Sequence, residues 1–323
     1  MPRFDSEDNK RNSKDKKSVS FIRHYNGYTG GHQKVRDYMR HFIDLHWQTN
    51  LFLDGQSATM PELFANIPKV NYQPTYDPTN ADIVFLAGMD WTTFLPLGIK
   101  NKTVVNLIQH VRHADSKQPL FPFLAQPAVR ICVSESVKQA ILPHANGPVY
   151  TVPMGHKIEM SASKKTNDIY ILANKQPELG RRLASYFKEQ QFSVICHDQY
   201  IEKHAVLTAM ASSSISVTLP HPTEGFYLPG IEAMALSDIA VVPDCVASVE
   251  YTGRFNNALR CELDYEDVIN AVKKATKLIR SPLQLEILKY FGYRRVNRYS
   301  LEREKIGLSK LLKQNACRGF YVK

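Results

Sequence analysis

Short apolar runs alternate with amphipathic segments through the first half of the chain. Residues 18–22 are predicted to form a strand, and the segment from His32 to Trp47 spaces its apolar side chains as a helix does. Ser134 is predicted to cap a helix that runs to about Leu142. Because strands that alternate with helices pair in parallel, this half is predicted to be an α/β domain. The other predicted strands of this half cover residues 81–86, 103–108, 130–133 and 148–152.

The same alternation resumes after a polar stretch, Lys157 to Asn167, which we interpret as a linker. A chain of 323 residues suits two domains of about 150 residues each. We therefore expect two similar α/β halves, with a ligand cleft between them at the carboxyl ends of the strands. The predicted elements of the second half are strands over 168–173, 192–196, 214–218 and 239–243 and helices over 177–189, 200–211 and 229–236.

Composition points to an intracellular protein that does not span a membrane. Residues 1–17 are polar and charged and are predicted to form a disordered tail, and no apolar run approaches the roughly 18 residues of a membrane span. The five cysteines are scattered and never spaced as C-x-x-C, which favours reduced thiols over a zinc ribbon or a disulfide scaffold. We expect a cytoplasmic location.

The net charge of +10 is concentrated near the C-terminus. Residues 271–323 hold 14 Lys or Arg against three Glu, a net of +11, so the preceding 270 residues are almost neutral at −1. Such a segment indicates an anionic partner such as a membrane surface, a lipid-linked phosphate acceptor or, with less support, nucleic acid. The alternative is a solvated helix face.

The most informative string is E-G-F-Y-L-P-G-I-E, residues 224–232. Pro229 suits the first turn of a helix, and the N-terminus of that helix would direct unpaired N–H groups at an anion. Glu224 on the loop and Glu232 on the helix could then hold hydroxyl groups on different parts of one phosphorylated ligand. The alternative is that Glu232 only complements the helix dipole and that Glu224 is solvated.

The whole string, with Glu-x7-Glu spacing, resembles the nucleotide-sugar motif of retaining GT-B glycosyltransferases, especially family 4. The resemblance implies two Rossmann-like domains that face each other across a cleft, with the acceptor on residues 18–157 and the donor on residues 168–300. In this architecture a terminal helix, here within the basic residues 301–323, commonly crosses back to the N-terminal domain. The resemblance also implies that Glu224 contacts the donor sugar, that Glu232 holds the ribose hydroxyls, and that Gly225 and Phe226 belong to the donor-binding loop.

Two glycines follow the first predicted strand. Gly30 and Gly31 would let a ligand approach the backbone at a helix N-terminus, and a Gly-Gly pair at this place is similar to the family pattern. An ordinary tight turn is the alternative. After the strand over 103–108, His110 or His113 could bond a sugar hydroxyl, and the resemblance does not choose between them.

Cations also follow the first strand of the second half. Asn174 and Lys175 lie after that strand and Arg181 lies on the next helix, in the region where the family places an Arg and a Lys on the donor diphosphate. Such cations would neutralise the charge that develops on the leaving nucleoside diphosphate. Solvated helix charges are the alternative. Further on, Glu250 remains in a region where many relatives have a Gly-rich turn before a Glu, but the glycines are absent.

The absence of an Asp-x-Asp triplet, H-E-x-x-H and clustered His/Cys/Asp ligands predicts a metal-independent enzyme with no cofactor. The expected activity is sugar transfer from a nucleotide-sugar to an acceptor hydroxyl of a glycan, glycolipid or lipopolysaccharide type, with retention of configuration, at the inner face of a membrane. Two alternatives remain open: a glycosyltransferase that modifies DNA, and a catalytically silent GT-B interaction subunit. The sequence does not fix the oligomeric state.

Overall fold

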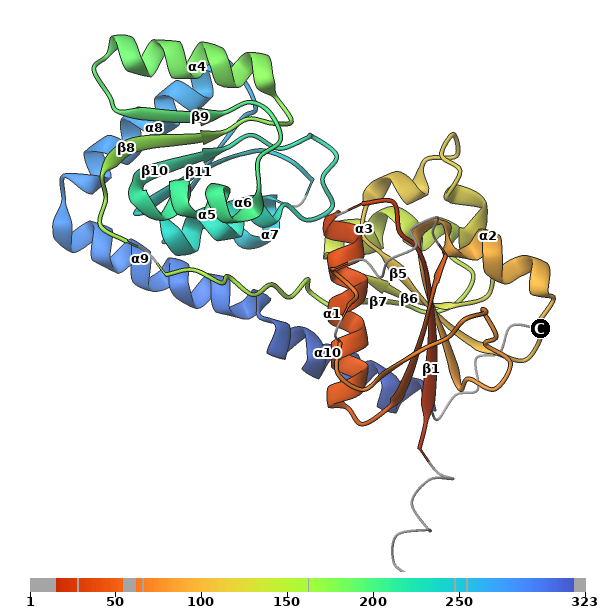
Figure 1. Cartoon of the computed structure of the whole chain (residues 1–323). Coiled ribbons are helices and arrows are strands. Elements are labelled where there is room, and N and C mark those ends of the chain that lie inside the picture. The colour runs from red at the N-terminus through yellow and green to blue at the C-terminus, as the bar shows by residue number, and fades with distance from the viewer. Residues whose placement is uncertain are drawn as a thin grey trace, which may run out of the picture.

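The computed structural model describes residues 16–27, 29–54, 62–65, 67–161, 163–246, 248–253 and 255–316. All but the last two residues of the predicted tail, and residues 317–323 of the predicted C-terminal segment, lie outside these ranges. Two parallel sheets form separate domains, one on each side of Figure 1, and the helices α9 and α10 run from one to the other. The predicted α/β fold class is confirmed.

The N-terminal domain is built on a seven-stranded parallel sheet with the order β3-β2-β1-β4-β5-β6-β7. Its helices are α1 (Gly30–Asp44), α2 (Trp91–Phe94) and α3 (Glu135–Ile141), with 3-10 helices η1 (Gly88–Asp90), η2 (Leu95–Leu97), η3 (Val111–Ala114), η4 (Phe121–Ala125) and η5 (Leu142–His144). The strands are β1 (Ser18–His24), β2 (Gln48–Asp54), β3 (Val70–Tyr72), β4 (Ile83–Ala87), β5 (Thr103–Ile108), β6 (Val129–Cys132) and β7 (Val149–Thr151).

The C-terminal domain has a five-stranded parallel sheet with the order β12-β11-β10-β8-β9. The strands are β8 (Asn167–Leu172), β9 (Val194–His197), β10 (Ser213–Thr218), β11 (Ile239–Pro243) and β12 (Ala258–Cys261). The helices are α4 (Pro177–Glu189), α5 (Lys203–Ser212), α6 (Leu228–Leu236), α7 (Ser248–Tyr251), α8 (Tyr265–Ile279), α9 (Pro282–Val296) and α10 (Leu301–Ala316), with the 3-10 helix η6 (Asn297–Tyr299) between α9 and α10. The interdomain linker is the segment 152–166 between β7 and β8.

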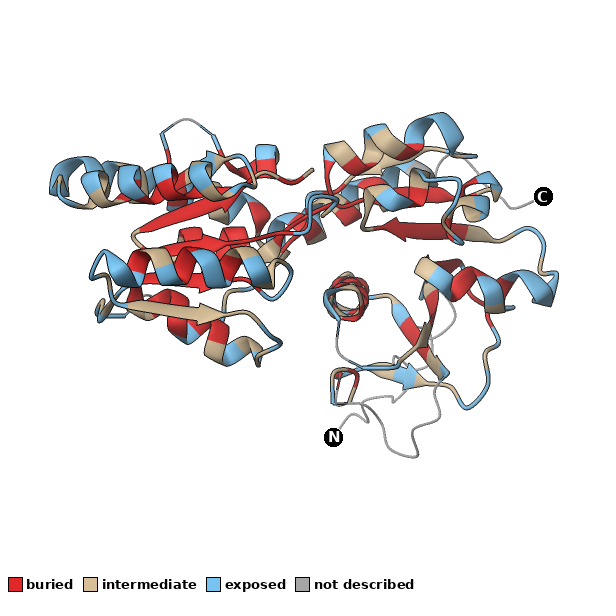
Figure 2. Ribbon diagram, turned by 90° about the horizontal axis from the view of Figure 1, so that it is seen from above, coloured by how far each residue is buried: buried red, intermediate tan, exposed pale blue. Residues whose placement is uncertain are grey.

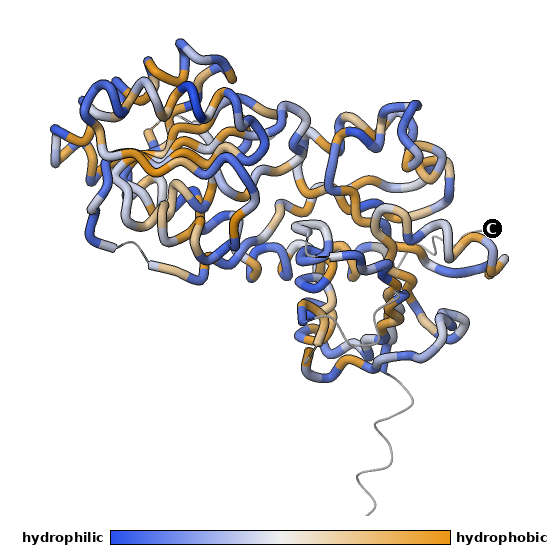
Figure 3. The backbone as a smooth tube through the Cα atoms, turned by 45° about the horizontal axis from the view of Figure 1, so that its top comes forward, coloured by the Kyte–Doolittle hydropathy of each residue, from blue (hydrophilic) through white to orange (hydrophobic). Residues whose placement is uncertain are grey.

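Strands of the C-terminal sheet are apolar on both faces, as strands covered on both sides must be. Ile169 and Ile171 pack in the cluster that includes α4 and α8, while Tyr170 and Leu172 pack in the cluster that includes α5 and α6. The strands are therefore mostly buried in Figure 2 and form the apolar centre of this domain in Figure 3. The second cluster continues into the N-terminal domain through residues such as Val137, so the two domains share apolar packing.

A buried arginine holds the loop before β6. The Arg130 side chain, on β6, is fully buried, and burial is the main reason that its pKa falls to about 10. Its guanidinium donates to five backbone carbonyls, which ties η4 and the turn before β7 to the sheet edge and supplies these groups with donors. The carbonyls belong to Phe123, Leu124, Gln126, Ala128 and Asn146.

Candidate functional site

The Glu-x7-Glu string forms the loop after β10 and the start of α6. Pro229 lies in the first turn of α6, as its fixed φ favours, and Glu232 follows one turn later with only 5% of its surface exposed. The Tyr227 hydroxyl donates to the Leu219 carbonyl over 3.2 Å, which fastens the end of the loop to its beginning. The two carboxylates therefore lie on a loop and a helix that are packed as one unit.

Glu224 and Lys175 come together from two neighbouring strands of the sheet. The Lys175 ammonium forms an ion pair and a hydrogen bond with Glu224, and it also lies 5.6 Å from the centre of the Tyr227 ring. Gln176 donates to the Pro220 carbonyl over 3.2 Å and so holds the turn after β8 against the loop after β10. Both turns lie at the carboxyl ends of parallel strands, which is where α/β sheets bind ligands.

Glu232 makes its closest side-chain contact with a residue of the interdomain linker. His156 Nε2 lies 2.7 Å from Glu232 Oε1, and because a carboxylate only accepts hydrogen bonds, Nε2 is the donor. Lys203 Nζ, at the start of α5, lies 4.0 Å from the same oxygen. The sequence analysis did not single out His156, which precedes the predicted linker Lys157 to Asn167, because no local pattern shows that its side chain turns back toward the sheet.

Gly225 is the closest point of approach between the two domains at this site. A Cβ atom on Gly225 would lie 2.5 Å from the Gln109 carbonyl oxygen and 2.9 Å from the His110 Cα, so only glycine fits here. Ser134 Oγ, which caps α3, donates to the Gly225 carbonyl over 2.9 Å. The loop of the C-terminal domain is thereby pressed onto the turn that follows β5 of the N-terminal domain.

A second contact joins the two domains at the same interface. Glu250 of α7 accepts hydrogen bonds from the Ser136 N–H and hydroxyl, at 2.9 and 3.1 Å, in the first turn of α3. A carboxylate of one domain thus satisfies unpaired donors at a helix start of the other. Among the described residues, Ser134, which caps α3, contacts Gly225, and Ser136, in the first turn of α3, contacts Glu250. The two domains are therefore joined at this loop and at α7.

The two candidate histidines differ in their surroundings. His110 is half-buried, and its pKa is lowered by burial and by Arg112, while the Glu224 charge opposes the shift; Lys175 also lowers it. His113 is buried, and burial, Arg112 and His110 lower its pKa to about 4, so it is neutral at ordinary pH. The structure brings His110, and not His113, within electrostatic reach of Glu224 and Lys175.

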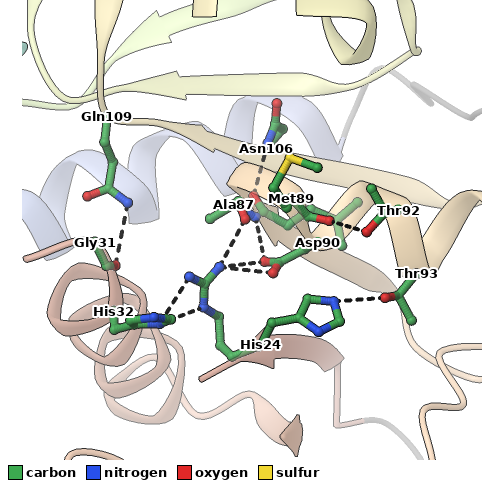
Figure 4. A network of polar contacts seen from close by, with 12 residues as sticks. His24, Gly31, His32, Ala87, Met89, Asp90, Thr92, Thr93, Asn106 and Gln109 are labelled. Atoms are coloured by element: carbon green, nitrogen blue, oxygen red, sulfur yellow. Dashed lines mark hydrogen bonds and ion pairs between the residues drawn. The ribbon is translucent and has the colours of Figure 1, made fainter. Parts of the chain in front are cut away.

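Gly30 and Gly31 begin α1 beside the same turn of the N-terminal domain. The Thr29 hydroxyl accepts from the His32 N–H and caps the helix, and the Gln109 amide donates to the Gly31 carbonyl over 3.5 Å (Figure 4). A Cβ on Gly30 would meet nothing within 4 Å, so a side chain could be added at this position without a clash. Gln109 thus links the start of α1 to His110.

A buried polar network supports the start of α1 (Figure 4). The Arg23 guanidinium donates to both carboxylate oxygens of Asp90, at 3.0 and 2.8 Å, and to the Ala87 carbonyl. It also contacts His32 Nδ1, 3.1 Å away, and burial followed by the Arg23 charge lowers the His32 pKa to about 4. Burial raises the Asp90 pKa to about 6 despite the Arg23 charge. These groups fix the carboxyl ends of β1 and β4.

The remaining sequence candidates make contacts of other kinds. Phe226 is buried, with its ring 5.2 Å from Tyr299 and 5.6 Å from Tyr251, so it anchors the loop in the core. The Arg181 side chain is 60% exposed and pairs with Asp198 over 2.9 Å, and Asn174 lies exposed in the turn after β8. The structure thus gives the Phe226 ring a packing role and places Arg181 on the outer side of α4.

The described residues also bear on metal binding and on membrane insertion. Within those ranges, no group of three or more His, Cys, Asp or Glu side chains is arranged to hold a metal ion. The helices in the same part of the chain are each too short or too polar to cross a bilayer.

Comparison with known proteins rests on the structure. No family model and no curated protein sequence matches the chain. Sucrose-phosphate synthase from Thermosynechococcus elongatus superposes with a TM-score of 0.69 at 12% identity, over 94% of this chain and all of that one. A glycosyltransferase from Rickettsia africae gives 0.67 at 10% identity, over 93% and 98% of the two chains. The chain has the GT-B fold.

Another GT-B structure is informative about ligands. HepE from Anabaena, in complex with UDP, superposes with a TM-score of 0.67 at 10% identity, over 92% of this chain and all of that one. The same protein is also known in complex with UDP-glucose. In the GT-B fold of the present chain, the segments that carry Gly31, His110, Lys175 and Glu224 all follow strands of the two sheets at their carboxyl ends.

Proposed function

We propose that this protein is a glycosyltransferase that moves a sugar from a nucleotide-sugar donor to an acceptor hydroxyl. The observation that carries the proposal is the pairing of Glu224 with Lys175 in a GT-B fold, on the loop whose Gly225 packs against the His110 backbone of the other domain. Glu232 lies on α6, the helix that follows this loop. Retention of configuration is part of the proposal and is supported by the resemblance of the 224–232 string to retaining enzymes.

Each residue has a distinct role in this proposal. Glu232 holds the ribose hydroxyls and Glu224 a hydroxyl of the donor sugar, since carboxylates accept from both. Lys175, whose ammonium lies between Glu224 and the Tyr227 ring, neutralises the leaving diphosphate together with the start of α6. His110 bonds a sugar hydroxyl from the opposite domain. The main catalytic contribution is to position donor and acceptor.

The proposal is tested first by binding and then by turnover. A thermal-shift screen of UDP-, GDP- and ADP-sugars should show a ligand that raises the melting temperature, because it binds only the native state. Glu232→Ala should weaken binding of the nucleoside diphosphate by about 1–3 kcal/mol, the value of a hydrogen bond to a charged group. Glu224→Ala should mainly lower kcat. A protein that binds these sugars but never turns them over would favour the silent GT-B subunit.

We further propose that α9 meets an anionic bilayer that carries a lipid-linked acceptor. Leu283, Ile287, Tyr290 and Phe291 are all exposed, and their spacing places them on one face of the helix. Arg294 continues the same face, with its guanidinium 5.9 Å from the centre of the Tyr290 ring. An apolar and aromatic stripe that ends in a cation matches the acyl boundary and the anionic headgroups of a lipid surface.

Liposome co-sedimentation tests this surface. Binding to vesicles that contain anionic lipid, weakened by high salt and by Ile287→Glu, is the expected result. Asn270→Glu, which places the same charge at an exposed position of α8 outside the stripe, is the control. Binding to DNA but not to vesicles would favour a DNA-modifying glycosyltransferase, and a dimer that Ile287→Glu dissociates would assign the stripe to a second copy of the chain.

A further inference from the structure

The linker between the domains passes through a buried charged cluster. Glu304 of α10 is completely buried and accepts from Lys34 Nζ over 3.1 Å and from His41 Nε2 over 2.8 Å, both on α1. Burial alone would lower the Lys34 pKa, but the Glu304 and Asp37 carboxylates outweigh it and raise that pKa. A charged lysine and a carboxylate therefore join α10 to α1 inside the protein.

The same carboxylate holds the linker backbone. The Gly155 N–H donates to Glu304 Oε1 over 2.9 Å, and the Gly155 carbonyl accepts from Lys34 Nζ. A Cβ atom on Gly155 would lie 2.8 Å from the Ser300 carbonyl oxygen and 2.9 Å from Leu301 Cα, so the linker lies directly on the start of α10. The next N–H, that of His156, donates to the Tyr299 carbonyl over 2.7 Å. Two consecutive linker residues are thus fixed, Gly155 by Glu304 of α10 and Lys34 of α1, and His156 by Tyr299 just before α10.

The side chain that leaves this fixed backbone contacts Glu232. His156 Nε2 donates to Glu232 Oε1, and the histidine and carboxylate side chains are both nearly buried. We propose that His156 is a positioning residue for the donor: it orients the Glu232 carboxylate, so that the docking of α10 on the N-terminal domain sets nucleotide affinity in the C-terminal domain. This inference rests on the proposed function, because it assigns the nucleotide to Glu232.

The contacts of Glu232 predict how loss of the His156 donor would change nucleotide affinity. Without the His156 donor, the carboxylate could turn toward Lys203, whose ammonium lies 4.0 Å from Oε1. The affinity for nucleotide would then fall. The GT-B fold, the interdomain contact at Gly225 and the Glu224–Lys175 pair would stay in place. A residue with a purely structural role would change stability and leave nucleotide affinity unaltered.

Two amide variants separate these cases. The longer amide side chain introduced by His156→Gln can place an N–H where Nε2 lies, whereas the shorter amide introduced by His156→Asn stops short of that place. Calorimetry with UDP, ADP and GDP identifies the nucleotide that the wild type binds best. For that nucleotide we expect a dissociation constant about tenfold higher in His156→Asn and within about twofold of wild type in His156→Gln, at matched melting temperatures.

Glu232→Ala distinguishes failure of the inference from failure of the proposed function. Weaker binding in Glu232→Ala together with equal affinities in the two His156 variants would overturn the positioning role and leave the proposed function standing. Wild-type affinity in Glu232→Ala, or no nucleotide binding by the wild type, would remove the proposed donor site itself. In the Glu232→Ala background, His156→Asn should cause no further loss, since His156 acts through that carboxylate.

Discussion

Gly225→Ala is the sharpest single test of how the two domains meet. The added methyl group would lie 2.5 Å from the Gln109 carbonyl oxygen and 2.9 Å from both His110 Cα and Val137 Cγ2. Because these are backbone and buried side-chain atoms, the loop and the turn after β5 must separate by at least roughly 0.5 Å. The hydrogen bond from Ser134 to the Gly225 carbonyl lies on the same side and would lengthen with them.

The loss of stability in Gly225→Ala follows from the overpacking and from the lengthened hydrogen bond. Overpacking of this kind costs about 1–3 kcal/mol, and a weakened hydrogen bond adds about 1 kcal/mol. We therefore expect the free energy of unfolding to fall by about 2–4 kcal/mol. Turnover should fall by about 100-fold, because Glu224 moves away from His110 by a sizeable fraction of an ångström. Nucleoside diphosphate affinity should stay near wild type, since His156 and not Gly225 holds Glu232.

Urea unfolding, single-substrate kinetics and calorimetry check the three parts. Gly30→Ala is the control for stability, because its added methyl group meets nothing within 4 Å, and its unfolding free energy should equal or slightly exceed that of the wild type. Wild-type stability and wild-type kcat in Gly225→Ala would refute the close approach of the two domains at this loop.

Three further predictions concern metal, pH and packing. Turnover should survive EDTA, and activity lost to EDTA and restored by Mn²⁺ would contradict the metal-independent mechanism. The His113 pKa is about 4 in the folded protein against about 6.5 when unfolded, so stability is complete above pH 6.5 and is lost as the pH falls toward 4. His113→Gln should reduce that loss by up to about 3 kcal/mol in urea titrations at each pH. Arg130→Lys should lower the free energy of unfolding by about 3 kcal/mol, because one ammonium cannot reach all five carbonyls, whereas exposed Arg280→Lys should not.

Much of the fold could be predicted because periodicity and capping are local properties. The predicted strand over 103–108 and helix over 177–189 have the bounds of β5 and α4, and Ser134 caps α3 as predicted. The strand β2 was missed because Gln48, Thr49 and Asn50 begin it, and they carry no apolar alternation although two of them are buried between neighbouring strands. Tertiary pairing, not local pattern, makes that segment a strand.

The candidate site could be predicted only in part, for a related reason. Glu224 and Lys175 stand out by their place after strands, and the structure pairs them. His156 and Glu304 carry no such signal, since one lies at the edge of a polar linker and the other among the charges of a basic helix. Their importance depends on three segments that meet in space: α1, the linker and α10. A single sequence does not encode that meeting in any local pattern.

The place of Glu304 in the order of synthesis has a consequence. Both sheets, the linker and the Glu-x7-Glu loop are synthesised before α10, yet the linker backbone is held by Glu304 and by the segment just before it. A nascent chain that has not reached α10 therefore lacks the carboxylate that holds Gly155 next to His156. If His156 orients Glu232 as proposed, the nucleotide affinity of such a chain should be lower and should rise when α10 docks.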